Sequence, residues 1–304
     1  MAIKIILNPI AGRGYGARSE PLIRQYLQAL GADFDLQRTA GPGHATELAA
    51  RAYEEHFDVV VAAGGDGTTH EVVNGLLSAS GAIADGRIVE TLGVLPVGSG
   101  SDFAHNVGVP ADLRAACARL VEGHTRLVDV CEVAVDEAAP RYFGNTVNVG
   151  FGGVVTLEAR KIKWLRGMAL YLPVVLKTVF LAQPAQMTIT YDAQSLDLRV
   201  PMVCVANGAR EGGGFFSTPD ALPDDGLFDM CVVRDIGSWG MLKLVPRFMN
   251  GSHTGRDEVV MARSKRVEIV SPDALIAHVD GEMLCTEAHH LVFDMLPQKL
   301  RVQC

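Results

Sequence analysis

The stretch Val59–Leu77, VVVAAGGDGTTHEVVNGLL, predicts a buried strand, a glycine turn and a helix, in that order. Val59–Ala63 is a continuous apolar run, as expected of a strand that is covered on both faces. The two glycines that follow allow a turn where a side chain would clash, and the spacing of Thr68 and Glu71 matches a capping box at a helix start. Such a unit gathers backbone N–H groups and a positive helix end at one point, which suits a phosphate group.

Asp66 lies inside this predicted phosphate site. A bare carboxylate repels phosphate, so it suits the site if a divalent cation, usually magnesium, lies between the two. The alternative is that Asp66 only builds the turn, because Asp-Gly pairs are frequent in turns. The tetrapeptide GGDG alone leaves both interpretations open.

Composition limits the class of protein. A chain of 304 residues favours two domains, and 48% hydrophobic with 20% charged residues is typical of a globular protein with large cores. A net charge of -8 argues against nucleic acid as a partner, since that requires a basic face. We find no secretory signal and no apolar run of the roughly 20 residues that span a membrane. The six scattered cysteines are typical of reduced packing groups, so we expect a cytoplasmic protein.

Strands and helices alternate in the first half of the chain, which predicts a mostly parallel sheet with helices on both faces. In such sheets ligands bind beyond the carboxyl ends of the strands. Glycine-containing loops follow the predicted strands at four such ends: Ala11–Gly16, Thr39–Gly43, Gly64–Thr69 and Gly98–Asp102. Four such loops on one edge of a sheet favour a nucleotide site.

From Arg126 onward, strands follow one another without long helices, which predicts an antiparallel β-sandwich. We therefore expect an α/β nucleotide-binding domain over residues 1–125 and a β-sandwich domain over residues 126–290. The strands in residues 291–304 are expected to return to the first domain.

Three motifs resemble the bacterial lipid kinases that carry the diacylglycerol kinase catalytic domain, relatives of sphingosine and ceramide kinases. They are NPIAGRG at Asn8–Gly14, GGDGTTHEVVNGL at Gly64–Leu76 and LPVGSGSDFAHNVGVP at Leu95–Pro110. The resemblance implies a Rossmann-like first domain of the NAD-kinase and phosphofructokinase type, with these motifs forming an ATP site. The residues it implies at the nucleotide are Asn8, Gly12, Thr39, Gly64, Gly65, Asp66, Gly67, Thr68, Thr69, His70 and Ser99. The chain departs from the family pattern at Ser99, Ser101 and His70, where threonine, asparagine and asparagine are usual.

The segment Asn207–Asp229 is rich in glycine and acidic residues. Clustered carboxylates and loop carbonyls suit a hard cation, although spacing alone would favour a solvated turn. The resemblance implies a metal loop with Asp225 as the carboxylate ligand, and the carbonyls of Leu222 and Leu227 beside it. This metal would be structural or regulatory, linked to the active site through water and Asp66.

The tetrapeptide Val279–Glu282, VDGE, offers two carboxylates. Residues two apart on a strand face the same way, so Asp280 and Glu282 could face one cleft; the alternative is an Asp-Gly hairpin turn. A lipid hydroxyl needs a base to take its proton. The resemblance implies that the base lies here, with Glu282 as the proton acceptor and Asp280 as its partner. Asp66 completes the expected catalytic set.

The segment Phe151–Ala182 combines a basic start with a long apolar part. Most of its apolar residues are expected to pack as core, whereas the basic end suits an anionic membrane surface. The residues of this basic end are Arg160, Lys161, Lys163, Trp164 and Arg166.

The motifs together predict an ATP- and Mg²⁺-dependent lipid kinase that acts on a diacylglycerol-like hydroxyl at the inner face of the membrane. Two alternatives are an NAD kinase, which shares GGDGT, and a non-catalytic nucleotide- or lipid-binding regulator. The sequence does not name the lipid, and it leaves a homodimer open.

Overall fold

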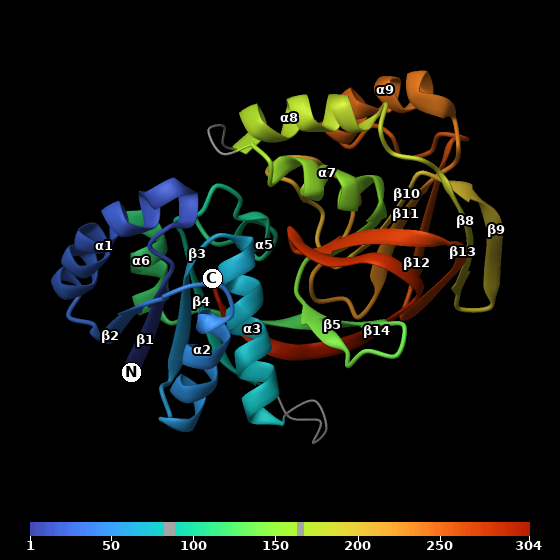
Figure 1. Cartoon of the computed structure of the whole chain (residues 1–304). Coiled ribbons are helices and arrows are strands. Elements are labelled where there is room, and N and C mark those ends of the chain that lie inside the picture. The colour runs from blue at the N-terminus through green and yellow to red at the C-terminus, as the bar shows by residue number, and fades with distance from the viewer. Residues whose placement is uncertain (82–88, 163–166) are drawn as a thin grey trace. The chain divides into compact units, whose positions relative to one another are not determined.

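The structure, a computed structural model, describes residues 1–81, 89–162 and 167–304. The chain divides into two compact units (Figure 1). The first unit contains Met1–Val130 and Leu296–Cys304, and the second contains Cys131–Met295. The boundaries expected from the sequence, at residues 126 and 291, lie a few residues before these points.

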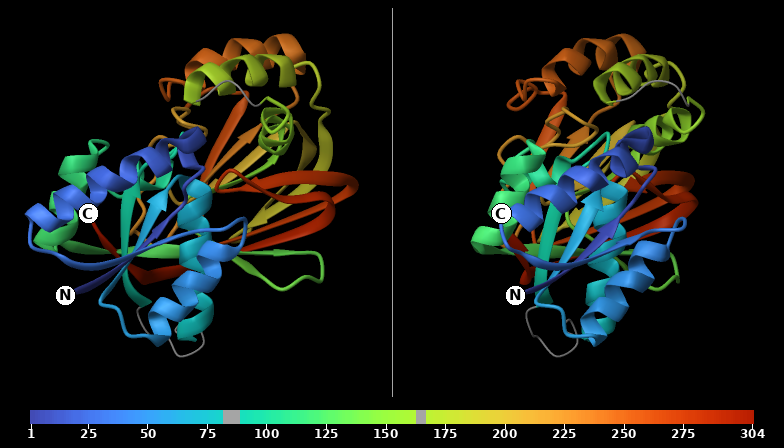
Figure 2. Two further views of the ribbon diagram at one scale, coloured as in Figure 1. Left: turned by 60° about the vertical axis from the view of Figure 1, so that its left-hand side comes forward. Right: turned by 90° about the vertical axis from the view of Figure 1, so that its left-hand side faces the viewer.

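The first unit is a parallel sheet with helices on both faces, as the alternation predicted. The strand order is β2-β1-β3-β4, followed by the last residues of β14, and every neighbouring pair is parallel. Helices α2 and α3 pack together on one face, and α1 and α6 on the other (Figure 2). The elements are β1 (Ala2–Leu7), α1 (Ala11–Ala29), β2 (Asp33–Arg38), α2 (His44–Glu54), β3 (Val59–Gly64), α3 (Asp66–Ser80), β4 (Val89–Pro96), α5 (Asp102–Asn106), α6 (Leu113–Glu122) and β5 (Thr125–Val135).

The central strand β3 is buried along its whole length because β1 and β4 flank it and helices cover both of its faces. This environment accounts for its unbroken apolar sequence. The chain ends in the same sheet, where Leu300–Gln303 pairs in parallel with the first half of β4.

The second unit is an antiparallel β-sandwich. Its elements are β6 (Arg141–Phe143), β7 (Thr146–Gly150), α7 (Phe151–Ala159), α8 (Gly167–Thr178), β8 (Ala185–Tyr191), β9 (Gln194–Val200), β10 (Met202–Ala206), β11 (Phe228–Val233), α9 (Gly237–Phe248), β12 (Val259–Ser264), β13 (Arg266–Val279) and β14 (Glu282–Gln303). The register between β13 and β14 shifts between Val270 and Leu275. The first half of β13 also pairs with β8, and its last residues pair with β7. The rings of Phe143, Phe228 and Phe293 pack at the centre of the core.

Helices α7, α8 and α9 pack on strands β10 and β11 through a second apolar cluster (Figure 1). Val155, Val174 and Val179 are buried there, which confirms a core role for part of the helical segment, whereas Leu157, Leu176, Phe180 and Leu181 are exposed. No helix within the described residues is both long and apolar enough to cross a bilayer.

Candidate active site

The turn between β3 and α3 is built by close contact between backbones. A Cβ atom at Gly98 would lie 2.2 Å from the Gly65 Cα, and one at Gly65 would lie 2.8 Å from the Gly100 carbonyl oxygen. The loops that follow β3 and β4 can therefore touch only because these positions carry no side chain. Their contact places the start of α3 at the carboxyl edge of the sheet.

The segment after β1 joins the same edge. Asn8 Nδ2 donates to Thr68 Oγ1 at 3.0 Å, which fastens this segment to the first turn of α3. The start of α1 is distorted, because Gly12, Arg13 and Gly14 have positive φ angles. A Cβ at Gly12 would lie 2.8 Å from the Val97 carbonyl oxygen. The glycine loop expected after β1 is therefore the non-helical beginning of a helix.

Asp66 is the first residue of α3. Its Oδ1 accepts a hydrogen bond from the Phe103 N–H at 3.0 Å, at the start of the short helix α5. A Cβ at Gly100 would lie 3.0 Å from its Oδ2. The carboxylate thus stands between the two glycine loops and also supports the second one, while Ser99 at the tip of that loop is exposed.

The remaining nucleotide residues expected from the sequence are buried or partly buried. Thr68, Thr69 and His70 are buried, and the hydroxyl of Thr69 contacts the Gly65 carbonyl at 3.3 Å. Thr39, which is partly buried, follows β2 directly and donates its N–H to the Leu7 carbonyl at 2.8 Å. The structure therefore gathers these residues at one edge of the sheet, but several of their side chains stabilise the loops.

The prediction that Thr68 and Glu71 form a capping box is wrong. Helix α3 begins at Asp66 with Gly65 as its N-cap, and no side chain caps it. Glu71 instead accepts hydrogen bonds from the N–H groups of Gly43 and Ala45, at 2.9 and 3.0 Å. It therefore caps the neighbouring helix α2, where a carboxylate also interacts favourably with the helix dipole. The first turn of α3 keeps its N–H groups without a side-chain cap, as an anion site requires.

In the second unit, Asp280 and Gly281 form the turn of the β13–β14 hairpin. Both have positive φ angles, 47° and 82°, as a two-residue hairpin turn requires. The expectation that Asp280 and Glu282 lie on one strand face is therefore wrong, because Asp280 belongs to the turn. The hairpin alternative describes the backbone correctly.

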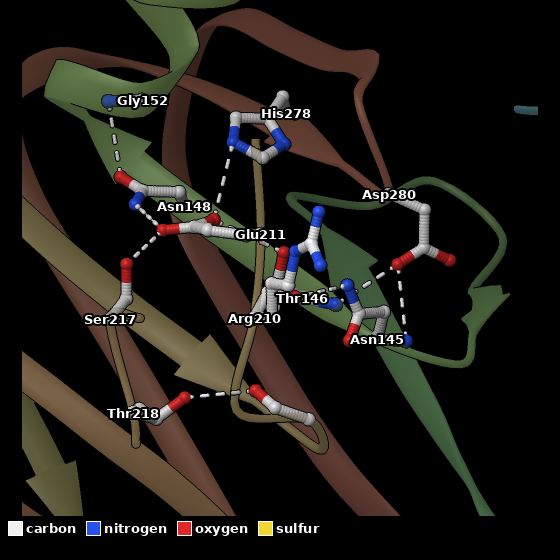
Figure 3. Close-up of polar contacts among 11 residues, drawn as sticks. Asn145, Thr146, Asn148, Gly152, Arg210, Glu211, Ser217, Thr218, His278 and Asp280 are labelled. Atoms are coloured by element: carbon white, nitrogen blue, oxygen red, sulfur yellow. Dashed lines mark hydrogen bonds and ion pairs between the residues drawn. The ribbon is translucent and has the colours of Figure 1, made fainter. Parts of the chain in front are cut away.

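Asp280 points inward and is buried (Figure 3). Its Oδ1 accepts from the N–H groups of Asn145 and Thr146 at 3.1 and 2.9 Å, and its Oδ2 accepts from Gly144 N–H at 3.2 Å. These three amides lie in and just after the short connection between β6 and β7. A carboxylate that accepts three backbone amides holds the hairpin turn against this connection.

Glu282, the first residue of β14, points elsewhere. Its side chain is about half exposed, and Oε2 accepts from Arg160 Nη2 at 2.6 Å. Lys161, the next residue of the expected basic end, pairs with Glu158. Lys163, Trp164 and Arg166 lie outside the described residues. The basic end thus supplies a partner for the expected base.

A buried polar cluster beside the hairpin was not predicted from the sequence (Figure 3). Glu211 accepts from Asn148 Nδ2 at 3.1 Å and from Thr146 Oγ1 at 3.2 Å, and Ser217 also donates to it. His278 Nε2 lies 3.8 Å from Glu211, and burial lowers the pKa of this imidazole despite the two nearby acids, Glu211 and Asp280. Asn145 and Asn148 within an otherwise apolar strand are the sequence feature that indicates such a cluster.

In the expected metal loop, Asp225 and Asp229 both interact with Arg263. Arg263 donates to the Asp225 carboxylate, and its Nε lies 3.4 Å from Asp229 Oδ2. Asp225 Oδ1 also accepts from the Leu227 N–H at 3.1 Å, and Leu222 is exposed. Burial raises the pKa of Asp229 to about 6, against the opposing effect of Arg263. Among the described residues, no three His, Cys, Asp or Glu side chains cluster as a metal site would require.

Comparison with known proteins identifies both halves. The family model described as diacylglycerol kinase catalytic domain matches residues 2–133, and the YegS C-terminal NAD kinase beta sandwich-like domain matches residues 145–304. This chain belongs to the diacylglycerol kinase family. The kinase is 28% identical over 284 residues to the diacylglycerol kinase of Bacillus subtilis, covering 92% of this chain and 89% of the relative. It is 27% identical over 286 residues to that of Mycobacterium tuberculosis H37Rv, covering 93% and 89%.

Solved structures share the fold of the kinase. The crystal structure of a diacylglycerol kinase from Bacillus anthracis superposes with a TM-score of 0.74 at 22% identity, over 99% of this chain and 96% of that chain. Another B. anthracis chain, 24% identical with the same coverage, gives a TM-score of 0.80. The α/β domain followed by an antiparallel sandwich is thus confirmed. The catalytic-domain family model and the diacylglycerol kinase relatives show that the protein is an enzyme, a lipid kinase.

Proposed function

We propose that the kinase transfers the γ-phosphoryl group of ATP, with Mg²⁺, to the hydroxyl of a diacylglycerol-like lipid. The observation that carries this proposal is the β3–α3 turn, where an uncapped helix start and Asp66 meet at the carboxyl edge of a parallel sheet. The relatives from B. subtilis and M. tuberculosis, named diacylglycerol kinases, support the choice of acceptor.

The first unit is proposed to hold the nucleotide. The N–H groups of the first turn of α3 suit phosphate oxygens, and Gly64, Gly65 and Gly98 allow the segments around this turn to pack closely against one another. Asn8 and Thr68 fix the loop after β1 against this turn. Thr39 and Ser99, which follow neighbouring strands, are proposed to line the nucleotide.

Magnesium fits this edge because Asp66 would otherwise repel the phosphates that the amides attract. When bound, Mg²⁺ neutralises charge on the transferred phosphoryl group. We assign Asp66 to hold the ion, directly or through water. At the second expected metal site, Arg263 already forms an ion pair with Asp225. We therefore propose Asp225 and the carbonyls of Leu222 and Leu227 as metal ligands only in a state in which this ion pair is broken.

The second unit is proposed to supply the base. Glu282 takes the proton of the lipid hydroxyl, whose oxygen forms the new P–O bond as the bond from phosphorus to the ADP oxygen breaks. Asp280 cannot accept that proton from its observed position without losing its bonds to three backbone amides. We therefore revise its role to holding the hairpin that presents Glu282.

The test is phosphoryl transfer from radiolabelled ATP to a panel of acceptors in detergent micelles: a diacylglycerol, a sphingoid base and, as the competing hypothesis, NAD⁺. We expect a labelled diacylglycerol product, loss of labelling with EDTA, and recovery with Mg²⁺. Labelling of NAD⁺ alone, or undiminished labelling in EDTA, would contradict the proposal.

A further inference from the structure

The second unit carries an exposed apolar surface that the catalytic groups do not use. It consists of Leu176, Phe180 and Leu181 along and just after α8, and Trp239 in α9, and we call it the aromatic patch. Trp239 is 72% exposed and Phe180 is 54% exposed. Their ring centroids lie 6.1 Å apart in an edge-to-face arrangement, so two separate elements build one surface.

The two helices that carry the patch are anchored by their buried faces. The inner faces of α8 and α9 bury Val174, Val175, Leu244 and Phe248 in the apolar cluster over β10 and β11 (Figure 1). The outer side chains are therefore not needed to fill the core. They remain exposed because nothing within the described part of the chain covers them.

The two helices that carry the patch contain basic residues and no acidic ones. Asp and Glu make up 35 of the 304 residues, yet neither occurs in α8 or α9. Lys243 and Arg247 follow Trp239 by one and two helical turns, are exposed, and form no ion pair in the described structure. Lys177 in α8 pairs with Glu158. Glu258 lies close enough to Arg247 to interact with it electrostatically, without a direct ion pair. Two cations that form no ion pair, on a helix without acidic residues, suit an anionic partner.

We propose that the aromatic patch, together with Lys243 and Arg247, docks the enzyme on an anionic phospholipid bilayer. The proposal rests on the proposed function, because a diacylglycerol-like substrate lies in a bilayer. Exposed aromatic rings favour the headgroup region, where an apolar body and a polar N–H are both satisfied, and nearby cations bind anionic headgroups. A second copy of this chain suits the surface less, since a symmetric contact would bring Lys243 and Arg247 close to their own copies.

This surface differs from the one that the sequence indicated. Arg160 and Lys161 of the expected basic end are engaged by Glu282 and Glu158. Lys243 and Arg247 form no such ion pair in the described structure, and they stand beside exposed aromatic side chains. The docking proposed here is peripheral, at the depth of the headgroups.

The first experiment follows Trp239 itself. The chain has two tryptophans, so Trp164→Phe leaves Trp239 as the only indole reporter. We expect vesicles of phosphatidylcholine with phosphatidylglycerol to shift its emission to shorter wavelength, and brominated lipid to quench it. Unchanged emission with these vesicles would overturn the proposal.

The second experiment measures sedimentation with the same vesicles. The pair Phe180→Ser with Trp239→Ser, and the pair Lys243→Gln with Arg247→Gln, should each weaken binding roughly tenfold or more. Val270→Ser removes another exposed apolar residue of the same unit, and Arg114→Gln with Lys265→Gln removes the same two kinds of charge elsewhere. These controls should bind like the wild type.

Three results would overturn the inference: no binding of the wild type, equal binding of the patch variants, or equal loss in the controls. A concentration-dependent dimer that disappears in the patch variants would overturn it too, because the surface would then be an interface between copies. Turnover of a short-chain diacylglycerol in micelles, measured in parallel, should be unchanged in the patch variants. That assay separates failure of docking from failure of the proposed reaction.

Discussion

Arg160 Nη2 lies 2.6 Å from Glu282 Oε2, at the end of α7 and the start of β14. Both side chains are about half exposed, so this ion pair contributes at most about 1 kcal/mol to stability. A charge-assisted hydrogen bond does, however, fix the direction of the carboxylate. The pair therefore matters chiefly for where the proposed base points.

We expect Glu282→Gln to lower kcat by roughly two to four orders of magnitude, the usual contribution of a positioned base. Arg160→Gln should lower kcat by roughly tenfold, because the base remains but loses its orientation. Neither should change the KM for ATP, since the proposed nucleotide loops belong to the other unit. Lys161→Gln, which removes the neighbouring cation, is the matched control. Wild-type kcat in Glu282→Gln would place the base elsewhere.

Asp280→Asn is expected to affect stability more than Glu282→Gln does. The amide keeps one acceptor oxygen but puts an NH₂ group against backbone N–H donors in a buried site, which should cost about 2–4 kcal/mol of unfolding free energy. Urea denaturation of both variants measures this difference. If Asp280→Asn unfolds like the wild type while kcat falls, Asp280 acts chemically and the positioning role is wrong.

The sequence predicted those features that depend on local pattern. The apolar run Val59–Ala63 became a central parallel strand that is buried along its whole length. The motif at Gly64–Gly67 became a turn at the carboxyl edge of the sheet, because glycine and helix-start patterns act over a few residues.

Features set by contacts distant in sequence were predicted wrongly or missed. Glu71 has the spacing of a capping box, but the backbone of α2, some 26 residues away in sequence, takes its carboxylate. The pairing of Asp280 with Thr146 spans 134 residues, and Glu211 meets Asn148 from a glycine loop. Residue spacing within a motif carries no information about partners so far away in sequence. Only the fold shows which carboxylates already accept hydrogen bonds from other parts of the chain.

Removal of Arg263 should make the kinase more responsive to magnesium. In the wild type its guanidinium occupies the Asp225 carboxylate that a cation would use, so the two cations compete. We expect Mg²⁺ to raise the Tm of Arg263→Gln more than that of the wild type, and to have the least effect on Asp225→Asn. Arg266→Gln, which loses its pairing with Asp294, is the control. An equal response in all four proteins would show that Asp225 holds no magnesium.

His253 should make folding pH-dependent. It is fully buried, with Nε2 3.0 Å from the Ser217 carbonyl oxygen and its ring stacked on Phe248. Burial lowers the pKa of this imidazole below its ordinary value of 6.5, so the unfolded chain binds the proton more readily than the native protein does. The unfolding free energy should therefore fall as pH drops below 6.5, and level off below the folded-state pKa. Urea midpoints across this range should fall less steeply in His253→Gln, and identical slopes would exclude this histidine as a cause.

Asp66 can be tested with two substitutions that separate its charge from its hydrogen bond. Asparagine keeps an oxygen that can accept from the Phe103 N–H, so Asp66→Asn should fold with nearly wild-type stability. Asp66→Ala removes that bond at the start of α5 and should lose about 1 kcal/mol of unfolding free energy. Both variants remove the charge that the proposed magnesium requires, so both should lower kcat at least 100-fold and abolish its normal dependence on Mg²⁺. Stopped-time assays over a Mg²⁺ series, together with urea denaturation, measure the two effects independently. If Asp66→Asn retained kcat within a few-fold of wild type with the same Mg²⁺ dependence, Asp66 would only build the turn.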